Sequence, residues 1–336
     1  MSAEVMDATL GTCLLAAPQA RVTDDVAAWW ALWRSIAEPG ASPAALAVAG
    51  GFAADRVGWA FAGGYQAALR ALLPELPLDT LAALCVTEAE GNRPRDIRTT
   101  IAPQPDGTLR IDGAKRWTTL GPASALLLIV GAMPAPADAS RPVLRVARVP
   151  VPTPGLVLQQ MPPTRFVPEV PHAQVQMQDV RVGADALLPG DGYDAYVKPF
   201  RTIEDLHVTL AVLAYLLREA RSRGWPAAFN EELVAAIGLL MQLAPEDTRA
   251  ALTHVALAGA LRIAQRLYAE AATLWAAAAD PAAQRWQRDA PLFEVAGTAR
   301  KQRAERAWQR LGGTAQVPSR TAIGAASGAP RPGTDD

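Results

Sequence analysis

The stretch Leu84–Gly121 reads LCVTEAEGNRPRDIRTTIAPQPDGTLRIDGAKRWTTLG. It contains two Asp-Gly dipeptides, Asp106–Gly107 and Asp112–Gly113, which are turn signals. The residues between them, Thr108–Ile111, are typical of a short strand. Shortly after the stretch, Leu126–Val130 is a continuous apolar run and is a second strand candidate. The pattern therefore predicts short strands joined by tight turns.

Three blocks of different composition make up the chain. Residues 1–80 are rich in Ala, Leu and Trp and predict a helical domain. Residues 81–194 predict a small β-barrel or sandwich. Residues 195–316 return to helical periodicity and predict an antiparallel four-helix bundle. The tail 317–336 is rich in Ala, Gly, Pro and Ser and predicts disorder.

Local signals place some of the helix boundaries. Asp55 is a candidate N-cap for the helix that follows it. Gly63–Gly64 interrupts that helix and indicates close packing there. In the last block Pro291 is expected to open a final helix that ends before Gly312.

Composition and charge exclude several classes of protein. The chain has 336 residues and a formal net charge of −1, which gives no general attraction to nucleic acid or to anionic lipid. Its two cysteines, Cys13 and Cys85, make neither a disulfide framework nor a zinc site. No run reaches the ~18 apolar residues that a membrane span needs. We expect a protein of the cytoplasm.

Two motifs of the opening stretch resemble the middle domain of the acyl-CoA dehydrogenases. Val86–Glu88 matches the start of the family pattern, a Thr-Glu pair, and Asp112–Gly121 matches its end, the pattern D-G-x-K-x-W-x-[TS]-x-G. The order of helices, β block and helical bundle agrees independently. The resemblance implies an α+β multidomain protein with the acyl-CoA dehydrogenase architecture and a shortened N-terminal domain.

The resemblance assigns FAD as the cofactor and gives three residues a role in binding its ring. Thr87 would hydrogen-bond the pyrimidine edge, Trp117 would lie against one face of the isoalloxazine, and Thr119 would hydrogen-bond near N5. Arg93 stands where the family has a small hydroxyl residue, in a loop that contacts the flavin and the thioester end of the substrate. Arg93 is therefore a candidate substrate-binding residue.

Glu204 is the candidate catalytic base. In most members of the family the base lies beyond a Gly-Gly pair near the C-terminus, but no glutamate follows Gly313 in this chain. A minority carry the base on the first helix of the bundle, at the position of Glu204. A carboxylate in an apolar pocket has a raised pKa and can take the α-proton of a thioester. The alternative is a first-turn glutamate that the helix dipole favours.

Glu204 and His207 also form half of a Glu-x-x-His metal pattern, but the chain has no second half on another helix, so we expect no metal site. The end of the bundle resembles a nucleotide-binding pattern of the family, Q-x-x-G-G, which is met by Gln309, Gly312 and Gly313. The family's Arg-x-x-Phe-Gly pattern is missing after the first bundle helix. The isoalloxazine half of the FAD site is thus better represented than the adenosine half.

The resemblance implies α,β-dehydrogenation of an acyl-CoA thioester, with an electron acceptor such as an electron-transfer flavoprotein and a homo- or hetero-oligomeric assembly. Two alternatives remain open. The chain is a non-catalytic or half-site subunit of a hetero-oligomeric dehydrogenase, or it is a flavin monooxygenase or oxidase of the same fold.

Overall fold

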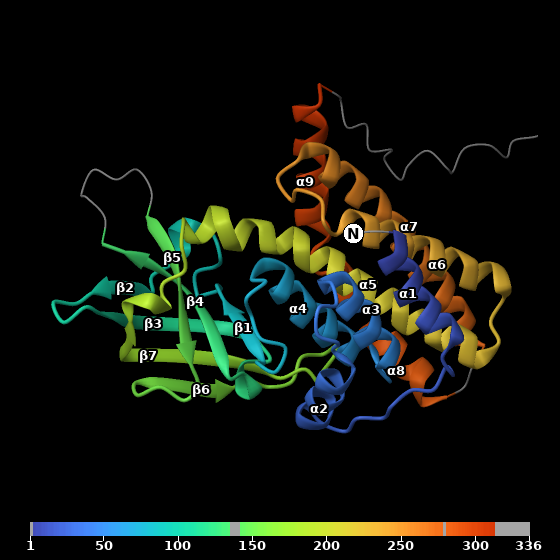
Figure 1. The fold of residues 1–336 in the computed structure, drawn as a ribbon, viewed down its shortest axis with the longest axis horizontal. Coiled ribbons are helices and arrows are strands. Elements are labelled where there is room, and N and C mark those ends of the chain that lie inside the picture. The colour runs from blue at the N-terminus through green and yellow to red at the C-terminus, as the bar shows by residue number, and fades with distance from the viewer. Residues whose placement is uncertain (1–2, 135–141, 278–279, 313–336) are drawn as a thin grey trace, which may run out of the picture.

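The computed structural model describes residues 3–134, 142–277 and 280–312. Figure 1 shows a β-sheet at one end of an elongated molecule and helices at the other, with the long helix α5 (Lys198–Arg223) running from the sheet through the helical part. The predicted order of helices, strands and helices is confirmed. The predicted disordered tail, 317–336, lies outside the described residues.

In the described part of the chain, four helices precede the sheet, and two of them begin at side-chain caps. Asp25 accepts a hydrogen bond of 2.8 Å from the amide of Ala28, and Ser42 caps the next helix. The prediction that Asp55 caps the fourth helix is wrong. Its carboxylate is bound by the guanidinium of Arg56 at 2.6 Å, and the helix begins without a side-chain cap. The helices are α1 (Ala3–Leu15), α2 (Val26–Ile36), α3 (Pro43–Ala53) and α4 (Val57–Leu72).

The described strands form one curled, mixed sheet in the order β1-β4-β2-β3-β7-β6, with β5 on the other side of β4. Strands β1 and β2 pair with β4 in parallel, and the remaining pairs are antiparallel. The strands are β1 (Ala82–Cys85), β2 (Thr100–Pro103), β3 (Thr108–Thr119), β4 (Leu126–Met133), β5 (Val143–Pro150), β6 (Leu156–Gln160) and β7 (His172–Gly183).

The apolar run in β4 is explained by burial on both faces. Leu127 and Ile129 belong to a core enclosed by the curl of the sheet, whereas Leu128 and Val130 belong to the larger core shared with the helices. Because alternate side chains of a strand point to opposite faces, both sets must be apolar. The sheet is therefore a wall between two cores.

Only one of the two Asp-Gly dipeptides is a turn. Gly107 has φ +82° in the hairpin between β2 and β3, as predicted. Asp112–Gly113 instead lies inside β3, where the pairing with β7 shifts register between Ile111 and Gly113. A Cβ on Gly113 would approach Thr99 Oγ1 to 2.6 Å. Gly113 thus adopts its positive φ in a β-bulge and not in a turn.

The remaining helices form the C-terminal bundle. Pro291 opens a 3₁₀ turn, Ala290–Glu294, and the final helix begins only at Gly297, so the predicted start at Pro291 is wrong. One short helix more than predicted precedes this turn. After α5 the helices are α6 (Ala227–Leu243), α7 (Ala251–Ala276), α8 (Pro281–Asp289) and α9 (Gly297–Arg310).

Glycines fix the position of α5 against the N-terminal helices. A Cβ on Gly64 of α4 would lie 2.7 Å from Val208 Cα, and one on Gly51 of α3 would lie 2.0 Å from Ala211 O. Backbones of α3 and α4 therefore touch the backbone of α5, as the Gly63–Gly64 pair predicted. Within the described chain, no helix combines the length and apolar character that crossing a membrane requires.

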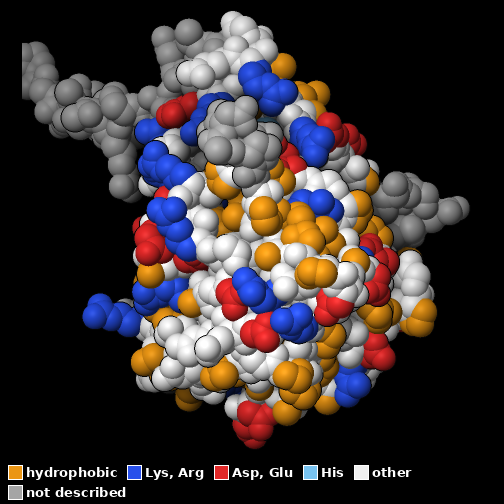
Figure 2. Space-filling view, turned by 90° about the vertical axis from the view of Figure 1, so that its left-hand side faces the viewer, with side chains coloured by type: hydrophobic (Ala, Val, Ile, Leu, Met, Phe, Trp, Pro, Cys, Tyr) orange, Lys and Arg blue, Asp and Glu red, His pale blue; other side chains and the backbone are white. Residues whose placement is uncertain are grey.

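Charged side chains of both signs are interspersed on the face of the sheet end that Figure 2 shows, among scattered hydrophobic ones. No field of a single sign covers that face. This agrees with the formal net charge of −1.

Candidate active site

Two cavities meet where the sheet faces α5. The larger has a volume of about 690 Å³ and the smaller about 160 Å³. Trp117 and Thr119 at the end of β3 line both cavities, and so does Glu204 in the second turn of α5. A ligand that spans both cavities would therefore pass between β3 and Glu204.

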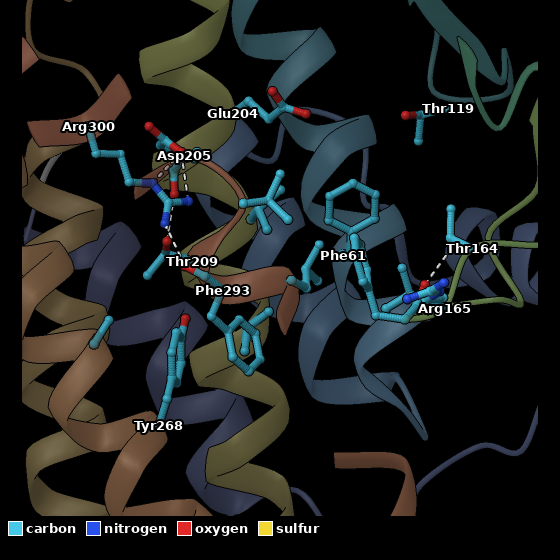
Figure 3. A pocket seen from close by; sticks show the side chains of 18 of the residues that line it. Phe61, Thr119, Thr164, Arg165, Glu204, Asp205, Thr209, Tyr268, Phe293 and Arg300 are labelled. Carbon is cyan, nitrogen blue, oxygen red and sulfur yellow. Dashed lines mark hydrogen bonds and ion pairs between the residues drawn. The ribbon is translucent and has the colours of Figure 1, made fainter. Parts of the chain in front are cut away.

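The larger cavity is mainly apolar and aromatic. Its walls come from α4, the segment before β7, α5, α7 and the turn before α9. Figure 3 shows Phe61 near the middle of this pocket, Tyr268 and Phe293 on one side, and Arg165 on another. Arg165 is exposed and stands beside Pro162 and Pro163. The volume and the apolar lining are those of a site for an organic ligand.

The smaller cavity is more polar. Thr87 lines it beside Asn92, and Arg116 and Arg201 line it as well. Tyr65 lies at its inner wall, where its hydroxyl accepts a hydrogen bond of 2.9 Å from the amide of Leu84. The cavity thus offers hydroxyl, amide and cationic groups next to Trp117.

Glu204 has no hydrogen bond or ion pair with any described residue. Its side chain is half-buried, because it faces the cavities while protein surrounds the rest of it. The pKa of Glu204 is raised to about 7, first by burial and then by the neighbouring charge of Asp205, while the charges of Arg300 and Arg201 oppose the rise. A free carboxylate that titrates near neutrality can accept a proton from a ligand in the cavity.

Asp205, the next residue, is buried and fully paired. Its carboxylate accepts from Arg300 at 2.8 Å and from Arg303 at 2.7 Å, both on α9. Figure 3 shows Asp205 turned toward Arg300 and Glu204 turned toward the side where Thr119 lies. The two adjacent carboxylates therefore differ in role. Asp205 holds α9 on α5, and Glu204 faces the ligand space.

Trp117 presents its ring to the cavity from a strained backbone. It has φ +58° within a second register shift of β3, and 46% of its surface is exposed. His172 meets the indole edge-on at 6.4 Å between ring centroids, and the Arg116 guanidinium lies 5.3 Å from the indole centroid. Positive φ is costly for a bulky residue and concentrates at ligand sites.

A buried ion pair joins the two motifs of the stretch Leu84–Gly121. Lys115 Nζ donates to Glu88 at 2.6 Å, and Glu88 also accepts from the amides of Arg98 and Thr99. The amide of Arg116 donates to the Thr87 carbonyl at 2.9 Å. These bonds fix Thr87 relative to the strand that carries Trp117. Lys115 has a lowered pKa because of its burial, which the Glu88 contact opposes.

We compared the fold of the chain with solved structures. The chain matches butyryl-CoA dehydrogenase from Megasphaera elsdenii with a TM-score of 0.67 at 17% identity, covering 92% of this chain and 99% of that one. The chain has the acyl-CoA dehydrogenase fold. It is also similar to FMN-bound TdsC from Paenibacillus sp. A11-2, with a TM-score of 0.66 at 18% identity over 90% of this chain and 95% of that one. No protein-family model and no curated protein matches the sequence.

Within the acyl-CoA dehydrogenase fold, the predicted site residues fall into two groups. Thr87, Trp117, Thr119 and Glu204 come together around the two cavities. Arg93 does not, because its side chain is exposed and lines neither cavity.

The nucleotide-binding residues predicted at the end of the bundle lie elsewhere. Gln309 and Gly312 are exposed at the end of α9 and line neither cavity, while Gly313 lies outside the described residues. Figure 1 shows α9 standing out from the bundle at that end.

His207 does not form a metal site with Glu204. It is buried, and its Nδ1 lies 2.8 Å from the Ile203 carbonyl. Burial lowers the pKa of His207 to about 4, so the ring is neutral and Nδ1–H donates. No group of three or more His, Cys, Asp or Glu side chains is placed to hold a metal ion in the described part of the chain.

Several residues of the site were not predicted from the sequence. Glu88 and Lys115 are part of the motifs, but the sequence pattern did not indicate that they form an ion pair. Arg116 and Arg201 line the smaller cavity, and Arg300 reaches Asp205 from 95 positions away. A cation next to the motif tryptophan is the one local signal that indicates Arg116.

Proposed function

We propose that the protein is an FAD-dependent oxidoreductase that dehydrogenates an acyl-CoA thioester between its α- and β-carbons. The observation that carries this proposal is the position of Glu204. An unpaired carboxylate with a pKa near 7 lies where two cavities meet, beside Trp117 and Thr119. α-Proton abstraction needs such a base in contact with the substrate.

The residues present fit a flavin ring. Trp117 offers a flat, exposed apolar surface, and Thr87 and Thr119 line the same cavity as Trp117. When bound, the flavin would supply the acceptor for the two electrons and the hydrogen that leave the β-carbon. The protein's own part is to orient the ring against Trp117 and to take the α-proton on a Glu204 carboxylate oxygen.

The larger cavity fits the acyl group of the substrate. Glu204 lies in the wall of this mainly apolar cavity, and its burial raises the pKa of that carboxyl, which makes the carboxylate a stronger base. Two buried free thiols, Cys13 and Cys85, suit a reducing compartment such as the cytoplasm.

Gln309 and Gly312 support an oligomeric form of this proposal. They are exposed at the end of α9 and do not line the cavities of their own subunit. We infer that they serve the adenosine half of the cofactor in another subunit, of the same chain or of a partner dehydrogenase. An electron-transfer flavoprotein is the class of acceptor that such a dehydrogenase would use.

A second candidate is a flavin monooxygenase or oxidase of the same fold. It is favoured by the aromatic lining of the larger cavity, from Phe61, Phe166, Tyr268 and Phe293, and by the similarity to TdsC, which was solved with FMN and with indole. Oxygen consumption that keeps pace with turnover would favour this candidate over a dehydrogenase.

Anaerobic titration of the flavin-loaded protein tests the main proposal. We expect bound FAD in the absorbance spectrum and bleaching of its visible band on addition of acyl-CoA. Glu204→Gln should retain FAD and lose the bleaching, since the amide cannot accept the α-proton. A protein that stays colourless after incubation with FAD would contradict the proposal.

A further inference from the structure

The smaller cavity contains two cations that no carboxylate of the described chain neutralises. Arg116 forms no ion pair, and its Nε is buried without a hydrogen-bond partner. The exposed Arg201 makes two long hydrogen bonds of 3.4 Å, to the carbonyl and the side-chain oxygen of Asn92, and its guanidinium lies 6.0 Å from the centroid of the Tyr193 ring. The Nε of Arg116 is thus the one of these donors that is buried without a partner, which is costly and indicates a missing acceptor.

The other charged group that lines this cavity is Glu204. It lies beyond salt-bridge distance of both arginines, and it faces the larger cavity as well. Tyr65 uses its hydroxyl to accept from Leu84. Arg201 is exposed, so water can accept from its guanidinium, whereas the buried Nε of Arg116 has no acceptor in the described chain. A ligand that enters the cavity would offer acceptors to both guanidinium groups.

The position and size of the cavity limit what that ligand group is. The cavity measures about 160 Å³, the volume of roughly five water molecules at ~30 Å³ each, so it takes one end of a large ligand. It adjoins the exposed ring of Trp117, over which the Arg116 guanidinium lies. Thr87 and Asn92 add one hydroxyl and one amide to the same wall.

We propose that Arg116 and Arg201 bind the pyrimidine end of the flavin, with their N–H groups donating to its ring carbonyl oxygens. This inference rests on the proposed function, because it takes the flavin as the ligand that lies against Trp117. The pyrimidine end carries two carbonyl oxygens and an acidic N–H between them, so it accepts hydrogen bonds and is favoured by positive charge. The two arginines thereby supply recognition of the ring within one subunit.

Two consequences separate this role from binding of a cofactor phosphate. Riboflavin, FMN and FAD share the ring and differ in phosphate content, so a contact to the ring affects the affinity for all three equally. Two nearby cations also favour loss of the proton from ring N3, since opposite charge within about 4–6 Å stabilises an anion. The pKa of N3–H in the bound, oxidised flavin should therefore be lower than in free flavin.

The test uses the full chain, stripped of flavin and titrated with riboflavin, FMN and FAD while flavin fluorescence is followed. We expect Arg116→Gln and Arg201→Gln each to weaken binding of all three by the same factor, on the order of tenfold. Both variants should raise the pKa of N3–H of bound riboflavin by about one unit, read from its absorbance. Arg98→Gln is the matched control, because Arg98 is exposed and lines neither cavity.

The outcomes distinguish failure of this inference from failure of the proposed function. If the glutamine variants weaken FMN and FAD but leave riboflavin unchanged, the arginines bind phosphate and the inference is overturned. The same holds if riboflavin affinity and the pKa of N3–H match the wild type in both variants. If the wild-type protein binds none of the three flavins, the proposed function fails first. Arg116→Lys, which keeps the charge, should restore the pKa of N3–H and supports the inference if it does.

Discussion

Arg300 on α9 donates to the carboxylate of Asp205 on α5 at 2.8 Å, and this contact joins two helices through residues that lie 95 positions apart in the chain. Arg303 adds a second donor at 2.7 Å. The ion pair does more than hold α9 in place. It brings a cation and an anion beside Glu204, where each acts on the pKa of that carboxyl with opposite sign.

Asp205→Asn should therefore make Glu204 more acidic. The substitution removes the negative charge that raises the pKa of Glu204 and leaves Arg300 un-neutralised, so both changes lower it. In the pH dependence of the rate of anaerobic flavin bleaching, the acidic limb should move to lower pH. Asp247→Asn is a control, because Asp247 is exposed and lines neither cavity. An unchanged limb in Asp205→Asn would argue against the electrostatic coupling.

Glu204→Gln should change how stability depends on pH. The folded-state pKa of Glu204, about 7, is raised above the ordinary glutamate value of 4.5, so between these values the folded state binds more protons than the unfolded state. Stability from this group is complete below about pH 4.5 and is lost as pH rises through 7. The wild type should thus lose on the order of 1–3 kcal/mol between pH 5 and pH 8 relative to the glutamine variant. Urea unfolding of both proteins at the two pH values checks this, and parallel losses would contradict it.

Glu88→Gln should be strongly destabilising because it leaves the Lys115 ammonium buried without a counter-ion. The side chain of Lys115 is fully buried, and its other contact is the Val86 carbonyl at 3.3 Å. Breaking one partner of such a pair costs about 3–5 kcal/mol. Replacing Lys115 with Met in the same chain removes the stranded charge and should recover most of the loss. Urea denaturation of the single and double variants measures the coupling, and additive losses would show that the two residues act independently.

The same ion pair illustrates what the sequence could and could not predict. Two sequence motifs predicted that Thr87, Trp117 and Thr119 belong to one site, because the motifs lie in one β block at a spacing similar to that of the family. Glu204 was assigned from the resemblance to family members that carry the base on the first helix of the bundle, supported by the lack of a glutamate after Gly313. These signals are short sequence motifs whose spacing can be compared directly. They located the residues that the structure brings together around the cavities.

Contacts that depend on tertiary packing could not be predicted from the sequence. The partners of Asp205 lie 95 and 98 positions away and are two arginines among many. Local signals were also ambiguous where one conformation serves two structures. An Asp-Gly pair provides the positive φ that a bulge needs as well as the one that a turn needs, and Asp112–Gly113 lies in a bulge. Asp55 precedes a helix as an N-cap would, but its carboxylate pairs with Arg56 instead of capping the helix.

Gly63 and Gly64 allow a matched test of how tightly α4 holds the helix that carries Glu204. A Cβ on Gly64 would lie 2.7 Å from Val208 Cα and 2.8 Å from the His207 carbonyl, so Gly64→Ala must push α5 away. A Cβ on Gly63 would find its nearest atoms at 3.6 Å, an ordinary contact.

We expect Gly64→Ala to lower the free energy of unfolding by about 1–3 kcal/mol, as overpacking does. Gly63→Ala should be neutral or stabilising by up to ~1 kcal/mol, because alanine favours the helix. Urea unfolding measures both effects, and the rate of anaerobic bleaching should fall only in Gly64→Ala, since displacement of α5 moves Glu204 relative to Thr119. Equal stability of the two variants would show that α4 and α5 can separate without cost, and that Glu204 is not held by this contact.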